Sequence, residues 1–151
     1  MLKILSWNVN GLKSAIKNGF KEIAEKTDAD IICLQETKIT NEKFDFELDG
    51  YYQYYNYAKK AGYSGVAIFA KEKPQNVLIG IPGNDNYDEL ENLDNEARVI
   101  TLEYGDFYIV SVYVPCVQRN LERRNFRAEF DYNFREYIEK LHNRKDVIIC
   151  G

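Results

Sequence analysis

The chain has 151 residues, which suits one domain with a sizeable core, and its 45% hydrophobic and 14% aromatic residues exclude a disordered chain. No apolar run approaches the length of a membrane span, so an integral membrane protein is also excluded. The net charge of −4 argues against a simple basic nucleic-acid binder, although a local basic patch would still permit contact with DNA.

The first 35 residues predict a β-α-β unit. Residues 2–8 and 30–35 are short apolar runs typical of buried strands. Between them, apolar residues at helical spacing predict one helix that runs to about Lys26; these are Leu12, Ile16, Phe20, Ile23 and Ala24. This order usually places the two strands side by side and parallel.

The middle of the chain predicts further strands, which are separated by turn residues. They lie at residues 51–57, 66–70, 77–81, 98–103 and 107–114. The last two form a hairpin through Gly105-Asp106. Residues 82–96 are rich in Asn, Asp and Glu, which indicates a long exposed loop.

The last third predicts a long helix and a final strand. Asn120 is the candidate cap of the helix, and its expected buried face consists of Phe126, Phe130, Phe134, Ile138 and Leu141. Residues 146–151 then form another apolar strand. Because termini are usually polar and exposed, this ending leads us to expect a truncated chain.

Cysteine and histidine offer little chemistry in this sequence. Cys33, Cys116 and Cys150 are scattered without metal-ligand spacing, and they fit a reducing compartment. The single histidine, His142, is expected to be a solvated residue near a helix end, without a triad partner. The start of the chain does not resemble a signal peptide, so we expect a cytoplasmic protein without a membrane partner.

Polar side chains follow the two strands of the β-α-β unit. Asn8 and Asn10 follow the first strand, and Glu36 follows the second. Ligands collect at the carboxyl ends of parallel strands, so these three residues could converge. Carboxylate and amide oxygens without His or Cys select a hard cation such as Mg²⁺ or Mn²⁺. On spacing alone, strand-end capping by Asn and a surface Glu explain the pattern equally well.

Four motifs carry a resemblance to a known family: Ser6–Leu12, Leu34–Lys38, Gly62–Ala67 and Tyr113–Pro115. They occur in the order seen in the exodeoxyribonuclease III/AP endonuclease family, which belongs to the endonuclease/exonuclease/phosphatase superfamily. The resemblance covers essentially the whole chain. It implies an α/β fold, a four-layer α-β-β-α sandwich of which this chain supplies only the N-terminal half.

The resemblance also implies roles for individual residues. Glu36 resembles the metal-binding glutamate of the family, and Asn8 resembles the amide that orders the metal and the catalytic acid. Asn10 stands where some members have a metal-linked Asp. Tyr113 resembles the active-site tyrosine that contacts the scissile phosphate. The implied cofactor is Mg²⁺, with Mn²⁺ as a possible substitute.

Basic and aromatic residues near the motifs resemble DNA-contacting positions of the family. The implied DNA-binding set is Lys13, Lys38, Tyr63, Arg98, Arg119 and Arg123. Tyr63 and Arg98 resemble positions that either touch DNA or brace the site. For Arg123, a solvated helix face is an equally good explanation. Cys116 departs from the pattern, since many members have a phosphate-holding Asn there and Cys is a poor donor.

The implied activity is cleavage of the phosphodiester 5′ to abasic sites in duplex DNA by a monomer, with possible 3′-exonuclease or 3′-phosphodiesterase action at blocked ends. Residues 1–151 would be the first part of a single domain, ending before the catalytic Asp-x-Asn motif of the family. We expect this piece alone to be inactive and unstable, with an exposed inner sheet face. The alternatives are a phosphoesterase acting on RNA, inositol phosphates or sphingomyelin, and a non-catalytic DNA-binding fragment.

Overall fold

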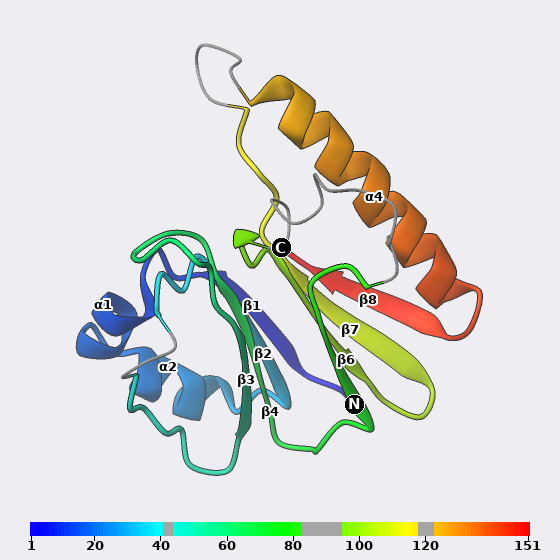
Figure 1. Ribbon diagram of the computed structural model, residues 1–151. Helices are drawn as coiled ribbons and strands as arrows, with labels where there is room; N and C mark the ends of the chain where they lie inside the picture. Colours follow the sequence, from blue (N-terminus) through cyan, green and yellow to red (C-terminus); the bar gives the residue numbers. More distant parts are fainter. Residues whose placement is uncertain (41–43, 83–94, 118–122) are drawn as a thin grey trace.

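The computed structural model describes residues 1–40, 44–82, 95–117 and 123–151. It contains two four-stranded sheets that face each other (Figure 1). The first sheet has the order β1-β2-β4-β3, with β1 (Ile4–Asn8), β2 (Ile31–Gln35), β3 (Tyr52–Asn56) and β4 (Val66–Ala70). The second has the order β5-β6-β7-β8, with β5 (Asn76–Ile79), β6 (Val99–Glu103), β7 (Phe107–Val112) and β8 (Asp146–Cys150).

Helices cover the outer face of each sheet, which gives the four-layer α-β-β-α sandwich expected from the sequence (Figure 1). Helices α1 (Leu12–Lys17) and α2 (Phe20–Thr27) lie on the first sheet, and α4 (Arg124–His142) lies on the second. No helix in the described part of the chain is long and apolar enough to cross a membrane.

The predicted single helix is two helices, which corrects the sequence-based expectation. The chain breaks between α1 and α2 at Asn18 and Gly19, where Gly19 has φ 96°. Glycine adopts this left-handed backbone without a steric penalty, so the chain can turn there. The turn leaves Phe20 fully buried, whereas Ile23, which shares the predicted helical spacing, is 41% exposed.

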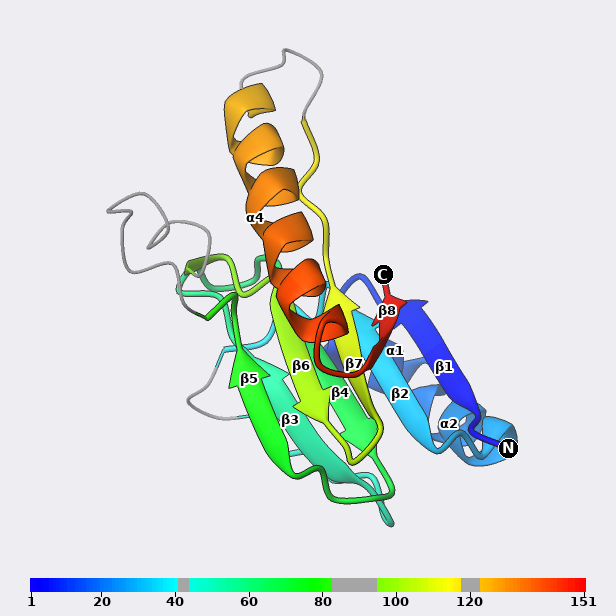
Figure 2. The same cartoon turned by 90° about the vertical axis from the view of Figure 1, so that its right-hand side faces the viewer.

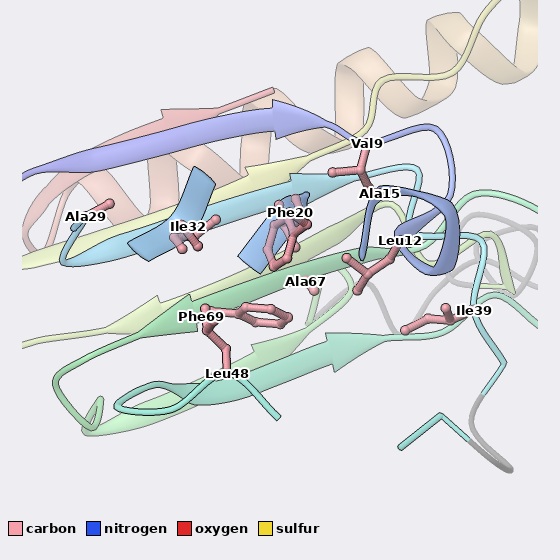
Figure 3. Close-up of a cluster of buried hydrophobic side chains, with 12 residues drawn as sticks. Val9, Leu12, Ala15, Phe20, Ala29, Ile32, Ile39, Leu48, Ala67 and Phe69 are labelled. Atoms are coloured by element: carbon pink, nitrogen blue, oxygen red, sulfur yellow. The ribbon is translucent and has the colours of Figure 1, made fainter. Parts of the chain in front are cut away.

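The core on the helix side of the first sheet is built from aromatic and aliphatic side chains (Figure 3). Phe20 of α2 contacts Phe69 of β4 edge to face, with ring centroids 6.1 Å apart. Leu12, Ile32 and Phe69 are fully buried. This packing fixes the ends of β1 and β2, where the predicted site lies.

Strand pairing confirms the predicted topology. β1 and β2 are parallel, with Asn8 opposite Gln35, and β6 and β7 form the expected hairpin. The long helix α4 buries Phe130 and Leu141 as predicted, while Phe126, Phe134 and Ile138 are only partly buried. Its candidate cap Asn120, like most of the predicted loop at residues 82–96, lies outside the described residues.

The expectation of an exposed inner sheet face is wrong for the centre of the sandwich. Side chains of both sheets meet there, and Cys33, Ile68, Ile100 and Ile109 are fully buried. Exposure of the inner faces lies at the edges of the sheets. At the β5 edge, Val77 and Ile79 pair with the inward-facing Leu102 and Ile100 and are 36% and 51% exposed. On the other side, β1 and β8 are the outermost strands (Figure 2). Ser6, on the same side of β1 as the inward-facing Ile4, is exposed there.

Candidate active site

Three loops interlock at one end of the first sheet. The loop after β1 bonds to the loop after β2 through the Gly11 N–H and the Glu36 carbonyl, at 2.7 Å. The loop after β2 bonds in turn to the loop before β4, since the Thr37 N–H donates to the Gly65 carbonyl at 3.0 Å and the Lys38 N–H to the Ser64 carbonyl at 2.8 Å. These main-chain bonds hold Glu36 at the junction of the three loops.

The backbone is strained at this junction. Four non-glycine residues adopt positive φ values of 46° to 53°: Asn10, Glu36, Lys38 and Ser64. Each such residue costs on the order of 1 kcal/mol and persists only where its surroundings enforce it. The interlocked main-chain bonds supply that enforcement, so the loops present the Asn10, Glu36 and Lys38 side chains in fixed directions.

The Glu36 carboxylate is the centre of a polar cluster. Asn8 donates its amide N–H to Glu36 Oε1 at 3.0 Å, while Asn8 Oδ1 accepts the Asn10 N–H at 3.1 Å. The Lys38 ammonium lies 3.1 Å from Glu36 Oε2 and also donates to Asn10 Oδ1. Asn8 therefore orients Glu36, and its own oxygen is already used as an acceptor by the backbone.

Tyr113, which follows β7, brings the second sheet into this cluster. Its hydroxyl interacts with the Glu36 carboxylate; burial, followed by this interaction, raises the pKa of Tyr113 to about 12. Partial burial alone would raise the pKa of Glu36. Hydrogen bonds from Asn8, Tyr113 and Lys38, together with the positive charge of Lys38, outweigh this effect of burial. The pKa of Glu36 therefore lies below its ordinary value. At neutral pH the site thus combines a carboxylate with a protonated phenol.

Arg98 holds Tyr113 in place. Arg98 is only 3% exposed. Its guanidinium donates a hydrogen bond to the Tyr113 carbonyl at 2.9 Å and lies 4.7 Å from the centroid of the Tyr113 ring. Of the two roles that the sequence left open for Arg98, DNA contact or bracing, this burial favours bracing. Tyr63 is half-buried, and its hydroxyl accepts hydrogen bonds from Arg98 at 3.2 Å and from Arg123 at 2.7 Å.

The remaining predicted residues are spread around the cluster. Lys13 is exposed on α1, one turn beyond the Asn10 loop. Arg123 precedes α4 and is half-buried, whereas Arg119 lies outside the described residues. The structure therefore brings Asn8, Asn10, Glu36, Lys38 and Tyr113 together. Cys116 is exposed and free, and His142 is exposed at the end of α4, away from this cluster.

Glu96 is a site residue that sequence reasoning missed. Its carboxylate accepts hydrogen bonds from Arg98 Nε at 2.6 Å and from Arg123 Nη2 at 2.7 Å. Glu96 fell within the acidic stretch that the sequence indicated as an exposed loop. Its spacing two residues before Arg98 was the only available signal, and that spacing alone predicts no contact.

The donor set fits a hard cation, although the described residues supply only part of a coordination shell. They contain no group of three or more His, Cys, Asp or Glu side chains that could hold a metal ion. Glu36 Oε2 and Asn10 Oδ1 do converge on a single positive charge, the Lys38 ammonium. Oxygen donors that can share one cation in this way suit Mg²⁺ or Mn²⁺, which usually keep several water ligands.

Fold and site together define a two-sheet α/β domain with a carboxylate, amides and a phenol at the strand ends. Residues 5–151 match the Endonuclease/Exonuclease/phosphatase family, and the chain belongs to that family. It is 43% identical over 151 residues to the exodeoxyribonuclease of Bacillus subtilis strain 168, covering 99% of this chain and 57% of that protein.

Two further relatives agree with this assignment. The chain is 43% identical over 154 residues to the DNA-(apurinic or apyrimidinic site) endonuclease of Dictyostelium discoideum, covering 99% of this chain and 41% of that protein. The crystal structure of the Xenopus laevis APE2 catalytic domain superposes with a TM-score of 0.86 at 31% identity, covering 98% of this chain and 57% of that one. The chain thus spans about half the length of the curated relatives it matches.

Proposed function

We propose that the protein is a DNA-repair phosphodiesterase that hydrolyses the phosphodiester bond 5′ to abasic sites in duplex DNA, with activity at blocked 3′ ends as well. The observation that carries the proposal is the Glu36 carboxylate, held by Asn8 and facing the Tyr113 hydroxyl at the junction of both sheets. Relatives named as an exodeoxyribonuclease and an abasic-site endonuclease support the choice of substrate.

The proposed cofactor is Mg²⁺, with Mn²⁺ as a substitute, held by Glu36 and Asn10, with Asn8 as the third proposed metal-site residue. When bound, such a cation polarises a phosphoryl oxygen and stabilises charge on the leaving oxygen. Asn8 donates a hydrogen bond to Glu36 Oε1 and so orients the carboxylate. Of the proposed ligands in the described residues, Glu36 carries the only negative charge.

Tyr113 is proposed to contact the reacting phosphate. Its phenol stays protonated at neutral pH, because burial and the neighbouring Glu36 carboxylate raise the pKa of Tyr113 above its already high ordinary value. It can therefore donate a hydrogen bond to a phosphate oxygen, and the Arg98 brace fixes it in advance. A preorganised donor of this kind stabilises charge that develops in the transition state without reorganisation.

Lys13, Lys38 and Arg123 are the cations proposed to contact phosphates of the DNA backbone around this point. Such contacts supply affinity and register rather than sequence choice. An abasic nucleotide has lost its base pairing and stacking, so it costs little to move into an active site. The proposed assembly is a monomer in the cytoplasm.

The test is cleavage of a duplex with one abasic site by the intact protein and by its Glu36→Gln variant. We expect the variant to lose at least about a hundredfold in Mg²⁺-supported kcat, because the charged ligand is gone. Glu25→Gln, a change at an exposed carboxylate on α2, is the matched control and should cleave at the wild-type rate. Wild-type cleavage by Glu36→Gln contradicts the proposal.

Two outcomes separate this function from its rivals. Faster hydrolysis of a phosphoinositide than of abasic DNA would assign another phosphoesterase of the family. Salt-sensitive binding of abasic DNA, without turnover at any Mg²⁺ or Mn²⁺ concentration, would assign a non-catalytic binding module.

A further inference from the structure

Glu96 joins two arginines and a tyrosine into one closed network. The Glu96 carboxylate accepts from Arg98 Nε at 2.6 Å and from Arg123 Nη2 at 2.7 and 2.9 Å. Both arginines also donate to the Tyr63 hydroxyl. The Glu96 side chain is only 20% exposed, so these ion pairs are partly shielded from water.

Arg98 depends on Glu96 for its charge balance. The Arg98 side chain is 2% exposed, and burying a guanidinium is costly unless a carboxylate pairs with it. Among the described residues, Glu96 is the carboxylate that forms a salt bridge with Arg98. Without it, a buried positive charge would have to move toward water or draw another group in.

Arg98 in turn holds Tyr113 from three directions. The Arg98 carbonyl accepts the Tyr113 N–H at 2.8 Å, and its Nη1 donates to the Tyr113 carbonyl at 2.9 Å. The guanidinium also lies near the Tyr113 ring, 4.7 Å from its centroid. Any displacement of Arg98 therefore shifts both the main chain and the ring of Tyr113.

The backbone between Glu96 and Arg98 is strained at Ala97. Ala97 is fully buried and adopts φ 52°, a left-handed conformation that is unfavourable for alanine. The side chains of Glu96 and Arg98, two residues apart, meet across this strained residue at 2.6 Å. A strained backbone that persists in a buried position indicates that the surrounding contacts enforce it.

We propose that Glu96 is a positioning residue, which acts through Arg98 to fix the Tyr113 hydroxyl opposite the Glu36 carboxylate. Among the described residues, Glu96 forms its hydrogen bonds with Arg98 and Arg123, so any effect on Tyr113 passes through an arginine. Its effect on geometry requires no substrate, whereas its effect on catalysis rests on the proposed phosphodiesterase function. The two parts are tested separately.

The geometric part is tested by NMR on protein labelled with ¹³Cζ-tyrosine, with the Tyr113 signal assigned by its loss in Tyr113→Phe. We expect Glu96→Ala to shift and broaden the Tyr113 signal, and Glu96→Gln, which keeps a neutral oxygen acceptor, to shift it less. Glu103→Gln is the control, because Glu103 is similarly enclosed and bonds Lys145 rather than Arg98. It should lower the melting temperature and leave the Tyr113 signal in place.

An unchanged Tyr113 signal in the Glu96 variants overturns the proposal. Equal shifts in the Glu96→Gln and Glu103→Gln variants also overturn it, since they would show a general loss of structure. If Glu96→Ala does not fold, Glu96→Gln decides between these outcomes. None of these measurements depends on cleavage activity.

The catalytic part is tested by a double-mutant cycle in the intact protein. We expect Glu96→Gln alone to lower kcat roughly tenfold, and to have no further effect when Tyr113 is already Phe. Independent, multiplicative losses would show that Glu96 does not act through Tyr113. Absence of cleavage by the wild-type protein refutes the proposed function instead, and the NMR result then decides the role of Glu96.

Discussion

A metal ion at the proposed site would compete with Lys38 for the same oxygens. The Lys38 ammonium lies 3.1 Å from Glu36 Oε2 and bonds Asn10 Oδ1, the two groups proposed to hold the cation. A divalent ion there must displace it. We therefore expect Lys38→Met to bind Mn²⁺ more tightly, on the order of tenfold, because one competing positive charge is gone. Titration of Mn²⁺ followed by electron paramagnetic resonance measures this affinity in the intact protein.

Lys17→Met is the control for that experiment, since Lys17 is exposed at the end of α1. Its affinity for Mn²⁺ should equal that of the wild type. Weaker binding by Lys38→Met would show that the ammonium organises Glu36 and Asn10 instead of competing for them.

Much of the candidate site was predictable because it lies at strand ends. The positions of Asn8, Asn10 and Glu36 follow from the parallel pairing of two apolar runs, and motif order supplied Tyr113. Glu96 was not predictable. Its contacts run to Arg123, 27 residues away, and across the left-handed Ala97, and no local pattern encodes either.

At the scale of elements, Gly65 locks the loop before β4 against the loop that carries Glu36. Gly65 has φ 86°. A Cβ at this position would lie 2.5 Å from Oγ1 of Thr37, and Thr37 is itself buried, with 1% of its surface exposed. We expect Gly65→Ala to destabilise the fold by about 1–3 kcal/mol, since backbone strain and a steric clash add up. Thermal unfolding followed by circular dichroism measures the change.

The matched control is Gly105→Ala in the hairpin between β6 and β7. A Cβ on Gly105 would meet no atom within 4 Å, so this change should leave stability within about 0.5 kcal/mol of wild type. Equal melting temperatures for the two variants would show that the interlocked loops can relax around Thr37.

Element type was easier to predict from the sequence than element boundaries. The runs that predicted strands correspond to β1 to β8, and β2, β4 and β6 are buried along their whole length, as their continuous apolar runs predict. The single predicted helix at residues 12–26 was wrong because periodicity continues across Asn18 and Gly19, while the backbone at Gly19 adopts a left-handed conformation that ends α1. Periodicity reports which side chains are apolar, and a left-handed glycine interrupts a helix without changing that pattern.

At the scale of the whole molecule, the two sheets stabilise each other through one shared core. Ile68 of β4 and Ile100 of β6 are both fully buried there, and Gln35 of β2 donates to the Ser111 hydroxyl of β7 at 3.1 Å. This polar bond crosses the core close to Glu36, so the two sheets are tied together near the candidate site. The four-layer sandwich therefore places Glu36 and Tyr113, which come from different sheets, within reach of each other.

The second sheet contains an ion pair that makes stability depend on pH. Glu103 accepts hydrogen bonds from Lys145 at 2.6 Å, Asn76 at 2.8 Å and Tyr108 at 3.2 Å. The bonds from Lys145 and Asn76, in that order, are the main reasons that the pKa of Glu103 falls from 4.5 to about 2. Because the pKa in the folded state is lowered, the stabilisation is fully present above pH 4.5 and is lost as the pH falls toward 2.

We therefore expect Glu103→Gln to weaken the pH dependence of stability within this window. Urea unfolding at pH 6, 4.5 and 3 should show a smaller loss of unfolding free energy on acidification in the variant than in the wild type. Glu25→Gln, at an exposed carboxylate on α2, should retain the full wild-type dependence. An acid dependence as steep in Glu103→Gln as in the wild type would place the responsible carboxylate elsewhere, with Asp28 as the next candidate, since its ion pair with Lys71 also lowers its pKa.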